Sequence, residues 1–367
     1  MELIFEKEEL SKSMQMIGNV AASRNTLPIL SNVLVRTVGD QIQLAATDLE
    51  VGIRSVVNGE IVTPGSITIP AKKLADIVRE LPEPAKVRMA VLANDRVEIE
   101  CEMAKFRIVG LGGDEFPSMP ELGDTFLTVN SEVLGKMIQK TIFAVSTEET
   151  RHFLNGVHFS AGPDSVRMVA TDGKRLAVAS QRQTEAIKKK ISIIVPTKTM
   201  SNILRIFTDS QDVKVALLEN QVVFATETIT LVSRLIEGEY PDYEAVIAPV
   251  MNNEINMVAS TEHLLSVIRR VSLLANPRTP SVKMEFKNND LSVSANTPEL
   301  GEAQEQMQVR SEGGSVEIAF NARFLMDVLR NIETAEVVFK LRDSLSPALI
   351  TPFEEDNYMC VVMPMRL

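Results

Sequence analysis

The chain has 367 residues, of which 45% are apolar, and a formal net charge of −11. This length favours two or three domains, and two cysteines, Cys101 and Cys360, exclude a disulfide framework and are expected to be buried thiols. Three histidines lack metal-ligand spacing, no apolar run reaches the roughly 18 residues of a membrane span, and the first residues are not typical of a signal peptide. We therefore expect a soluble, cytoplasmic protein without a metal or cofactor.

Apolar periodicity in the first 120 residues predicts a mixture of helices and strands. Helices are expected over about 8–16 and 71–80. Short or alternating apolar runs predict strands at 3–5, 32–36, 41–46, 86–92, 96–101 and 105–109. Two helices among antiparallel strands define an α+β unit.

The same order returns twice further along the chain. Strands predicted at 126–129 and 255–258 each precede a helix. Four helices are expected, over about 131–143, 197–207, 261–273 and 321–331. Ser131 and Thr261 are the predicted N-caps of the two helices that follow the strands.

Sequence landmarks recur at a nearly constant offset, which is the signature of an internal repeat. The segment 46–48 (ATD) returns at 170–172, and Phe116-Pro117 returns as Tyr240-Pro241, both 124 residues later. A third, fainter copy includes 295–297 (ANT). We therefore predict three tandem α+β domains, at 1–122, 123–248 and 249–367.

Basic residues are concentrated on the predicted helices of the second and third domains. These helices carry eight basic residues and one acidic residue, Asp327. If the helices of the tandem domains lie on one side, the domains form an arc. Closing this arc into a ring would line the central hole with basic residues, which bind a phosphate backbone without reading its base sequence. The simpler interpretation is that bases occupy the solvated faces of amphipathic helices. The candidate DNA contacts proposed on charge are Lys136, Lys140, Arg205 and Arg269.

Asp48 and the Thr-Asp-Gly segment at 171–173 invite a catalytic hypothesis, but this pattern is typical of turns. The sequence has no phosphate loop, no Gly-x-Ser-x-Gly motif and no paired Cys/His cluster. We expect a protein that is not an enzyme. Two alternatives stay open: a protein-binding scaffold that never encircles DNA, and a hydrolase that uses Asp172 with Arg175.

Several motifs carry a resemblance that covers the full length. They are 26–30 (TLPIL), 47–50 (TDLE), 154–156 (LNG), 169–173 (VATDG), 175–177 (RLA), 241–243 (PDY) and 361–367 (VVMPMRL). The chain resembles the bacterial DNA polymerase III β subunit family, the replicative sliding clamps. The resemblance implies a non-catalytic processivity factor of DNA replication, with three clamp domains forming half of a closed six-domain ring around double-stranded DNA.

The resemblance implies a head-to-tail homodimer in which the first domain meets the third domain of a second copy. The predicted strand 105–109 then becomes a covered edge, and Phe106 and Ile108 pack against the partner subunit's Leu273 and Leu274. Facing charges are implied too: Lys73, Arg96 and Lys105 opposite Glu299, Glu302 and Glu305. Met103 and Gly301 stand where the family often has a base and an acid.

The resemblance also implies a pocket between the second and third domains for short linear motifs of the DNA polymerase III catalytic subunit, the clamp loader, other polymerases and repair proteins. Methionine and leucine suit such a groove because they adapt to several partners. The implied lining is Leu154, Thr171, Gly173, Arg175, Leu176, Pro241, Val246, Phe324, Leu345, Val361, Met363, Pro364, Met365 and Arg366. Ala245 stands near Val246 where the family often has a base.

For DNA, the resemblance implies Arg24, Arg151 and Lys198, with Glu148 close to Arg151.

Overall fold

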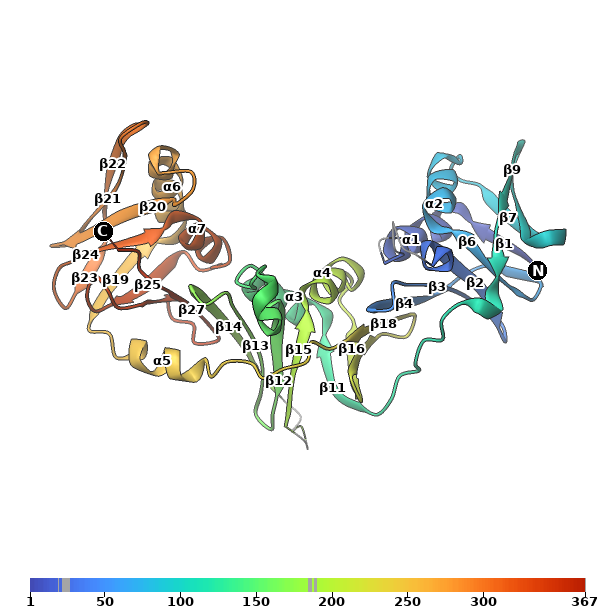
Figure 1. Cartoon of the computed structure of the whole chain (residues 1–367), viewed down its shortest axis with the longest axis horizontal. Helices are drawn as coiled ribbons and strands as arrows, with labels where there is room; N and C mark the ends of the chain where they lie inside the picture. Colours follow the sequence, from blue (N-terminus) through green and yellow to red (C-terminus); the bar gives the residue numbers. More distant parts are fainter. Residues whose placement is uncertain (19, 22–26, 184–186, 188–189, 367) are drawn as a thin grey trace. The chain divides into compact units, whose positions relative to one another are not determined.

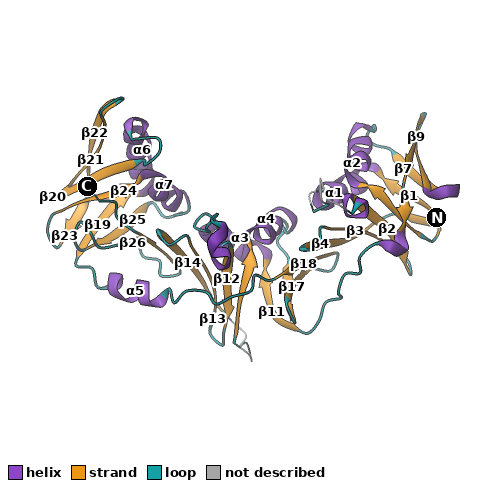
Figure 2. Ribbon diagram, viewed as in Figure 1, coloured by secondary structure: helices purple, strands orange, loops and turns teal. Residues whose placement is uncertain are grey.

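The computed structural model describes residues 1–18, 20–21, 27–183, 187 and 190–366. The chain divides into two compact units, one of Met1–Glu132 with Ser201–Leu235 and one of Val133–Met200 with Ile236–Leu367. Each unit combines antiparallel sheets with helices (Figures 1 and 2). The fold is therefore α+β, as predicted, while the boundaries between the three predicted domains stay predictions.

The first unit holds a five-stranded sheet in the order β5-β1-β7-β8-β9 and a nine-stranded sheet in the order β10-β6-β2-β3-β4-β18-β17-β16-β11. The helices α1 (Lys7–Ile17) and α2 (Ala71–Glu80) belong to this unit. Its strands are β1 (Glu2–Glu6), β2 (Asn32–Val38), β3 (Gln41–Thr47), β4 (Val51–Val57), β5 (Glu60–Thr63), β6 (Ser66–Pro70), β7 (Lys86–Val91), β8 (Arg96–Cys101), β9 (Ala104–Val109), β10 (Leu111–Gly112), β11 (Thr125–Asn130), β16 (Asp212–Leu218), β17 (Gln221–Ala225) and β18 (Ile229–Arg234).

The second unit holds a nine-stranded sheet in the order β15-β12-β13-β14-β27-β26-β25-β19-β23 and a four-stranded sheet in the order β22-β21-β20-β24. Its helices are α5 (Glu244–Met251), α6 (Thr261–Val271) and α7 (Ala322–Arg330), while α3 (Ser131–Ile142) and α4 (Thr197–Ile206) contribute residues to both units. Its strands are β12 (Gly156–Ala161), β13 (Ser165–Thr171), β14 (Arg175–Arg182), β15 (Ile191–Pro196), β19 (Ile255–Ser260), β20 (Ser281–Lys287), β21 (Asp290–Thr297), β22 (Gly301–Gln308), β23 (Arg310–Glu312), β24 (Val316–Asn321), β25 (Glu336–Leu341), β26 (Ala348–Pro352) and β27 (Tyr358–Val362).

Apolar spacing explains how helices pack onto the sheets. In α1, Leu10, Met14 and Ile17 are buried, and their spacing of four and three residues puts them on one face. In β1, Leu3 and Phe5 are buried while their neighbours are not, as expected of a strand with one face in the core. The predicted helices and strands are confirmed within a few residues of their expected ends.

The predicted N-caps are each wrong by one residue. Asn130 accepts the backbone N–H of Glu132 at 2.9 Å, and Ser260 accepts that of His263 at 3.4 Å, so the capping residues precede Ser131 and Thr261. The Thr261 hydroxyl instead donates to the Thr334 carbonyl at 2.8 Å. Because the Thr261 hydroxyl is bonded to a carbonyl outside its helix, it does not act as the N-cap acceptor for the first backbone N–H groups of that helix.

The 124-residue repeat holds at the level of single hydrogen bonds. In the first copy, the Asp48 carboxylate accepts the N–H groups of Glu50 and Val51 at 3.0 and 2.7 Å. In the second copy, Asp172 accepts those of Lys174 and Arg175 at 2.9 and 3.0 Å. Both aspartates therefore hold tight turns, which confirms the turn interpretation.

Candidate functional site

A cavity of about 590 Å³ lies in the second unit, and most of its lining is apolar. Nine of the residues expected from the family resemblance line it: Leu154, Thr171, Gly173, Arg175, Leu176, Pro241, Val246, Val361 and Met363. The lining also includes Arg151, Phe153, Lys174, Asp242, Tyr243, Ala245, Pro249, Val250 and Pro347. A cavity of this size and polarity suits apolar side chains of a ligand.

Two neighbouring strands and one helix position the walls of this cavity. On β14 and β27, Leu176 lies opposite Val361 in an antiparallel pair. These two residues pack with Val250, at the end of α5, in a buried cluster that Tyr243 covers. The wall is thus held by core packing, so the cavity is formed without a ligand.

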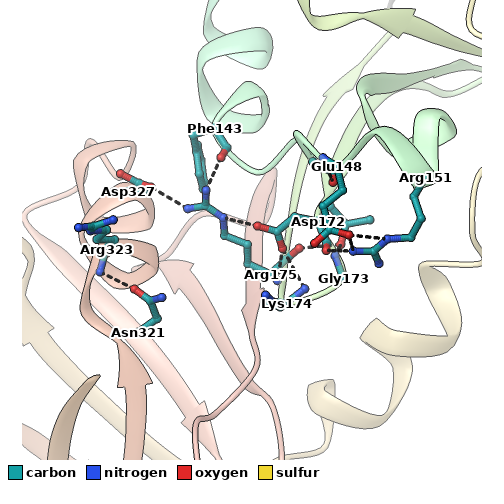
Figure 3. A network of polar contacts seen from close by, with 12 residues as sticks. Phe143, Glu148, Arg151, Asp172, Gly173, Lys174, Arg175, Asn321, Arg323 and Asp327 are labelled. Carbon is teal, nitrogen blue, oxygen red and sulfur yellow. Dashed lines mark hydrogen bonds and ion pairs between the residues drawn. The ribbon is translucent and has the colours of Figure 1, made fainter. Parts of the chain in front are cut away.

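One of the lining residues, Arg175, is largely buried and lies at the centre of a network of polar contacts (Figure 3). The Arg175 side chain, 11% exposed, lies 3.1 Å from an Asp172 oxygen and 2.7 Å from an Asp327 oxygen. It also donates to the Phe143 carbonyl at 2.6 Å, and its guanidinium lies 4.4 Å from the Phe324 ring centroid. Planar, multiply bonded guanidinium groups are rigid, so Arg175 ties β14 to α7.

Charged side chains form the rim of the cavity. Arg151, which the resemblance implied as a DNA contact, lines this cavity and donates to Glu148 at 2.7 Å and to the Asp172 carbonyl at 3.2 Å. Arg151 holds the pKa of the Glu148 carboxyl below its usual range by this hydrogen bond. The Lys174 ammonium is exposed, and within the described part of the chain it has no ion-pair partner.

A second cavity, of about 640 Å³, adjoins the first and shares Lys174 and Arg175 with it. Phe324, expected in the pocket, lines this second cavity. Four other expected residues lie outside the linings of both cavities: Leu345, Pro364, Met365 and Arg366. Leu345 is 71% exposed, and Met365 bonds through its backbone to the Ala319 carbonyl.

Some lining residues were missed although the sequence offered a signal. Lys174 stands between two expected pocket residues, and Tyr243 ends the 241–243 motif. Pro249 and Val250 belong to α5, a helix that the sequence did not predict, because it is apolar on nearly all sides and contains a proline. Their contribution depends on how α5 packs, which local sequence does not specify.

A buried histidine lies behind the cavity wall. The His158 ring stacks on Tyr240 at 4.9 Å between centroids and lies 5.9 Å from the Tyr243 ring, which lines the cavity. Its Nε2 is 2.9 Å from the Ser192 hydroxyl, while Nδ1 is buried and has no hydrogen-bond partner within the described residues. Burial lowers the pKa of His158 because it penalises the charged ring.

Stability should therefore fall in mildly acidic solution. The unfolded chain binds a proton to His158 near its usual pKa of about 6.5, whereas the folded chain resists it, so stability is present above that pH and decreases as pH falls below it. We expect His158→Phe, which keeps a stacked ring, to reduce this loss between about pH 7 and 5. Urea midpoints measured across this range test the expectation, and an unchanged pH dependence in the variant would contradict it.

The candidate DNA contacts lie mostly on helices. Lys136 on α3, Lys198 and Arg205 on α4 and Arg269 on α6 are exposed. Lys140 is partly buried, with its ammonium 5.3 Å from the Tyr358 ring centroid. Arg24 lies outside the described residues. Their role in binding DNA stays a prediction.

The candidate dimer residues lie on the edge strands β9 and β22, on helix α2, on strand β8 and on exposed connecting segments. Phe106 and Ile108 belong to β9, the last strand of its sheet, and Leu273 is 76% exposed with Leu274 partly buried beside it. Lys73, Arg96, Glu299 and Glu302 are exposed.

Two of the charged candidates already have partners in their own chain. The Lys105 ammonium lies 2.6 Å from Glu100 and 2.9 Å from Glu98, and Glu305 accepts from Arg270 at 2.9 Å. Each gains less from an interface pair, because it must exchange one ion pair for another.

The remaining chemistry of the described residues is limited. Cys101 and Cys360 are buried free thiols, as expected, and burial raises the pKa of Cys360 to about 12. The described residues hold no group of three or more His, Cys, Asp or Glu side chains suited to a metal ion. Among them, no helix is long and apolar enough to cross a membrane.

Comparisons with known proteins agree along the whole chain. Three family models match: the N-terminal, central and C-terminal domains of the DNA polymerase III beta subunit, at residues 1–120, 128–242 and 247–366. The beta sliding clamps of Pseudomonas aeruginosa and Chlamydia muridarum are 34% and 33% identical, over 100% of this chain and 100% and 99% of theirs. The solved DNA polymerase III subunit beta of Pseudomonas aeruginosa matches with a TM-score of 0.94 at 33% identity, each chain covered in full.

A further solved structure, the DNA polymerase sliding clamp of Bacillus subtilis, matches with a TM-score of 0.95 at 27% identity, over 100% of this chain and 99% of that chain. These matches and the pocket define a class of protein, a clamp built of three tandem α+β domains. The chain belongs to the DNA polymerase III beta subunit family.

Proposed function

We propose that the chain works as a DNA sliding clamp, a non-catalytic processivity factor that encircles double-stranded DNA and tethers replication and repair proteins to it. Membership in the beta subunit family over the full length is the observation that carries this proposal. Exposed bases on α3, α4 and α6 support it, because a mobile ring needs contacts that are non-specific and individually weak. We assign its site of action to the cytoplasm.

Two copies of the chain complete the proposed ring. Each unit has a sheet with an edge strand that can pair with another chain: β9 in the first unit and β22 in the second. Exposed edges favour pairing with another chain, and a heterologous contact between these ends closes after two subunits if the geometry permits. The exposed Leu273 supplies apolar surface for such a contact.

The apolar cavity of the second unit is the proposed docking site for partner peptides, including motifs of the DNA polymerase III catalytic subunit and the clamp loader. Clamps of Pseudomonas aeruginosa and Bartonella birtlesii have been solved bound to griselimycin. We propose that griselimycin binds this chain too, in the cavity lined by Leu176, Val361 and Met363. Binding of griselimycin in competition with a polymerase peptide would support a shared site.

Topology gives the decisive test of the clamp. Protein loaded onto a nicked circular plasmid by the clamp loader should stay bound through a wash at high salt, because encirclement does not depend on phosphate contacts. Cutting the plasmid should release it, and blocking the new ends with bulky bound proteins should restore retention. Equal retention on circular DNA and on linear DNA with free ends would overturn the proposal.

A further inference from the structure

The strand pair that forms the cavity wall in the second unit has a close copy in the first unit. In the second unit, the backbone N–H of Met363 donates to the Lys174 carbonyl at 2.9 Å. In the first unit, the N–H of Arg234 donates to the Glu50 carbonyl at 2.9 Å, and residues 50 and 174 are related by the 124-residue repeat. Both units therefore build the same frame at this place.

One of the differences between the two frames lies at residue 52. In the second unit, Leu176 lies opposite Val361, and both line the cavity. In the first unit, Gly52 lies opposite Val232. Glycine at residue 52 leaves space where the second unit has a leucine side chain.

Met119 fills that space. A Cβ atom added to Gly52 would lie 2.9 Å from the Met119 Cε and 3.3 Å from its Sδ, so the end of the Met119 side chain would have to move. Met119 also packs against two buried clusters of the first unit, one containing Val232 and the other containing Leu34 and Phe116. An unbranched methionine suits such an irregular gap.

The segment that carries Met119, residues 116–122, is named here the linker strap. Phe116 is buried, and Leu122 packs on the cluster that contains Val232. Between them, Glu121 accepts two hydrogen bonds from Arg54, at 2.7 and 2.9 Å, a bidentate pair that fixes the strap. The equivalent residues of the second unit are Tyr243 and Val246, which line the open cavity there, and Tyr243 also packs against the cluster that contains Val361.

We propose that the linker strap is a resident ligand: Met119 and Leu122 occupy, in the first unit, the groove that corresponds to the partner-peptide pocket of the second unit. Partner peptides are thereby kept off the first unit, and removing these two side chains opens a groove for apolar linear peptides. The expectation that the opened groove takes apolar linear peptides rests on the proposed function of the second unit's cavity. The position of Met119 and Leu122 in the groove of the first unit does not depend on that function.

The test uses the full chain and a fluorescent heptapeptide with the sequence of the strap, Phe-Pro-Ser-Met-Pro-Glu-Leu. Met363→Asp removes the second unit's pocket as a binding site in both proteins compared. In that background, the chain with an intact strap should bind no peptide at micromolar concentration, because a tethered ligand competes at an effective concentration on the order of millimolar. Adding Met119→Ala and Leu122→Ala should create one site per chain.

Two outcomes of the titration would overturn the proposal: binding with the strap intact, or no new site in a variant whose circular dichroism and urea midpoint show it folded. A titration of the unmodified chain with a peptide that carries the polymerase motif reports separately on the second unit's pocket. A failure of the proposed function would therefore show as a missing site in the unmodified chain, whatever happens at the strap.

A second measurement covers the case in which the double variant does not fold. Met119 should react with hydrogen peroxide much more slowly than Met103, which is fully exposed in the same chain. Gly52→Ala should raise the Met119 rate several-fold relative to Met103, because the new Cβ meets only the flexible end of Met119 and the Thr47 hydroxyl. Equal rates for the two methionines in the unmodified chain, or no change in Gly52→Ala, would show that Met119 is not seated in the groove.

Discussion

Replacing Met363 by aspartate should weaken the binding of a partner peptide by at least about 30-fold, which corresponds to a loss of roughly 2 kcal/mol. Met363 lines the apolar cavity but is 42% exposed in the free chain, so the substitution should leave folding intact. A docked peptide would bury the new carboxylate without a partner, and an unpaired buried charge is costly. Fluorescence anisotropy of a labelled peptide carrying the polymerase motif measures the effect.

Leu345 provides the matched control. The family resemblance implied it as a pocket residue, but it is 71% exposed and lies outside the cavity lining. Leu345→Asp introduces the same charge a short way along the chain from Met363 and should change the affinity little. Equal losses for the two variants would mean that peptides bind across a wider surface than the cavity.

Local interactions explain why much of the fold could be predicted. The turns at Asp48 and Asp172 are held by contacts between residues at most three apart, so the sequence alone specifies them and the repeat becomes visible. The helices α2 and α7 carry their buried residues at spacings of three and four, which local periodicity also reveals. Each of these features depends on a few neighbouring side chains.

Features that depend on distant residues were missed. The helix α5 has no polar face to give it a period, and it is stabilised by packing against Val361 and Leu349 in the second unit. The position of Met119 depends on the absence of a side chain at Gly52, more than sixty residues earlier. Family resemblance supplied nine residues of the cavity lining, but not the rim residue Lys174, nor the place of Arg151 in that lining.

Replacing Arg175 by methionine should lower the free energy of unfolding of the second unit by about 3–5 kcal/mol. The guanidinium, 11% exposed, pairs with both Asp172 and Asp327, and its loss leaves two partly buried carboxylates with fewer partners. It also leaves the Phe143 carbonyl without this donor and removes the stacking on Phe324. Urea unfolding followed by circular dichroism measures the change.

An exposed pair in the same unit gives the control. Arg182 and Asp356 lie 3.9 Å apart, with side chains 91% and 93% exposed, so Arg182→Met should cost no more than about 1 kcal/mol. Arg175→Lys should recover only a small part of the loss, because an ammonium cannot reach two carboxylates and a carbonyl in one plane. Full recovery by lysine would show that charge alone holds this network of contacts, whereas the expected failure assigns the role to the planar fork that links β14 to α7.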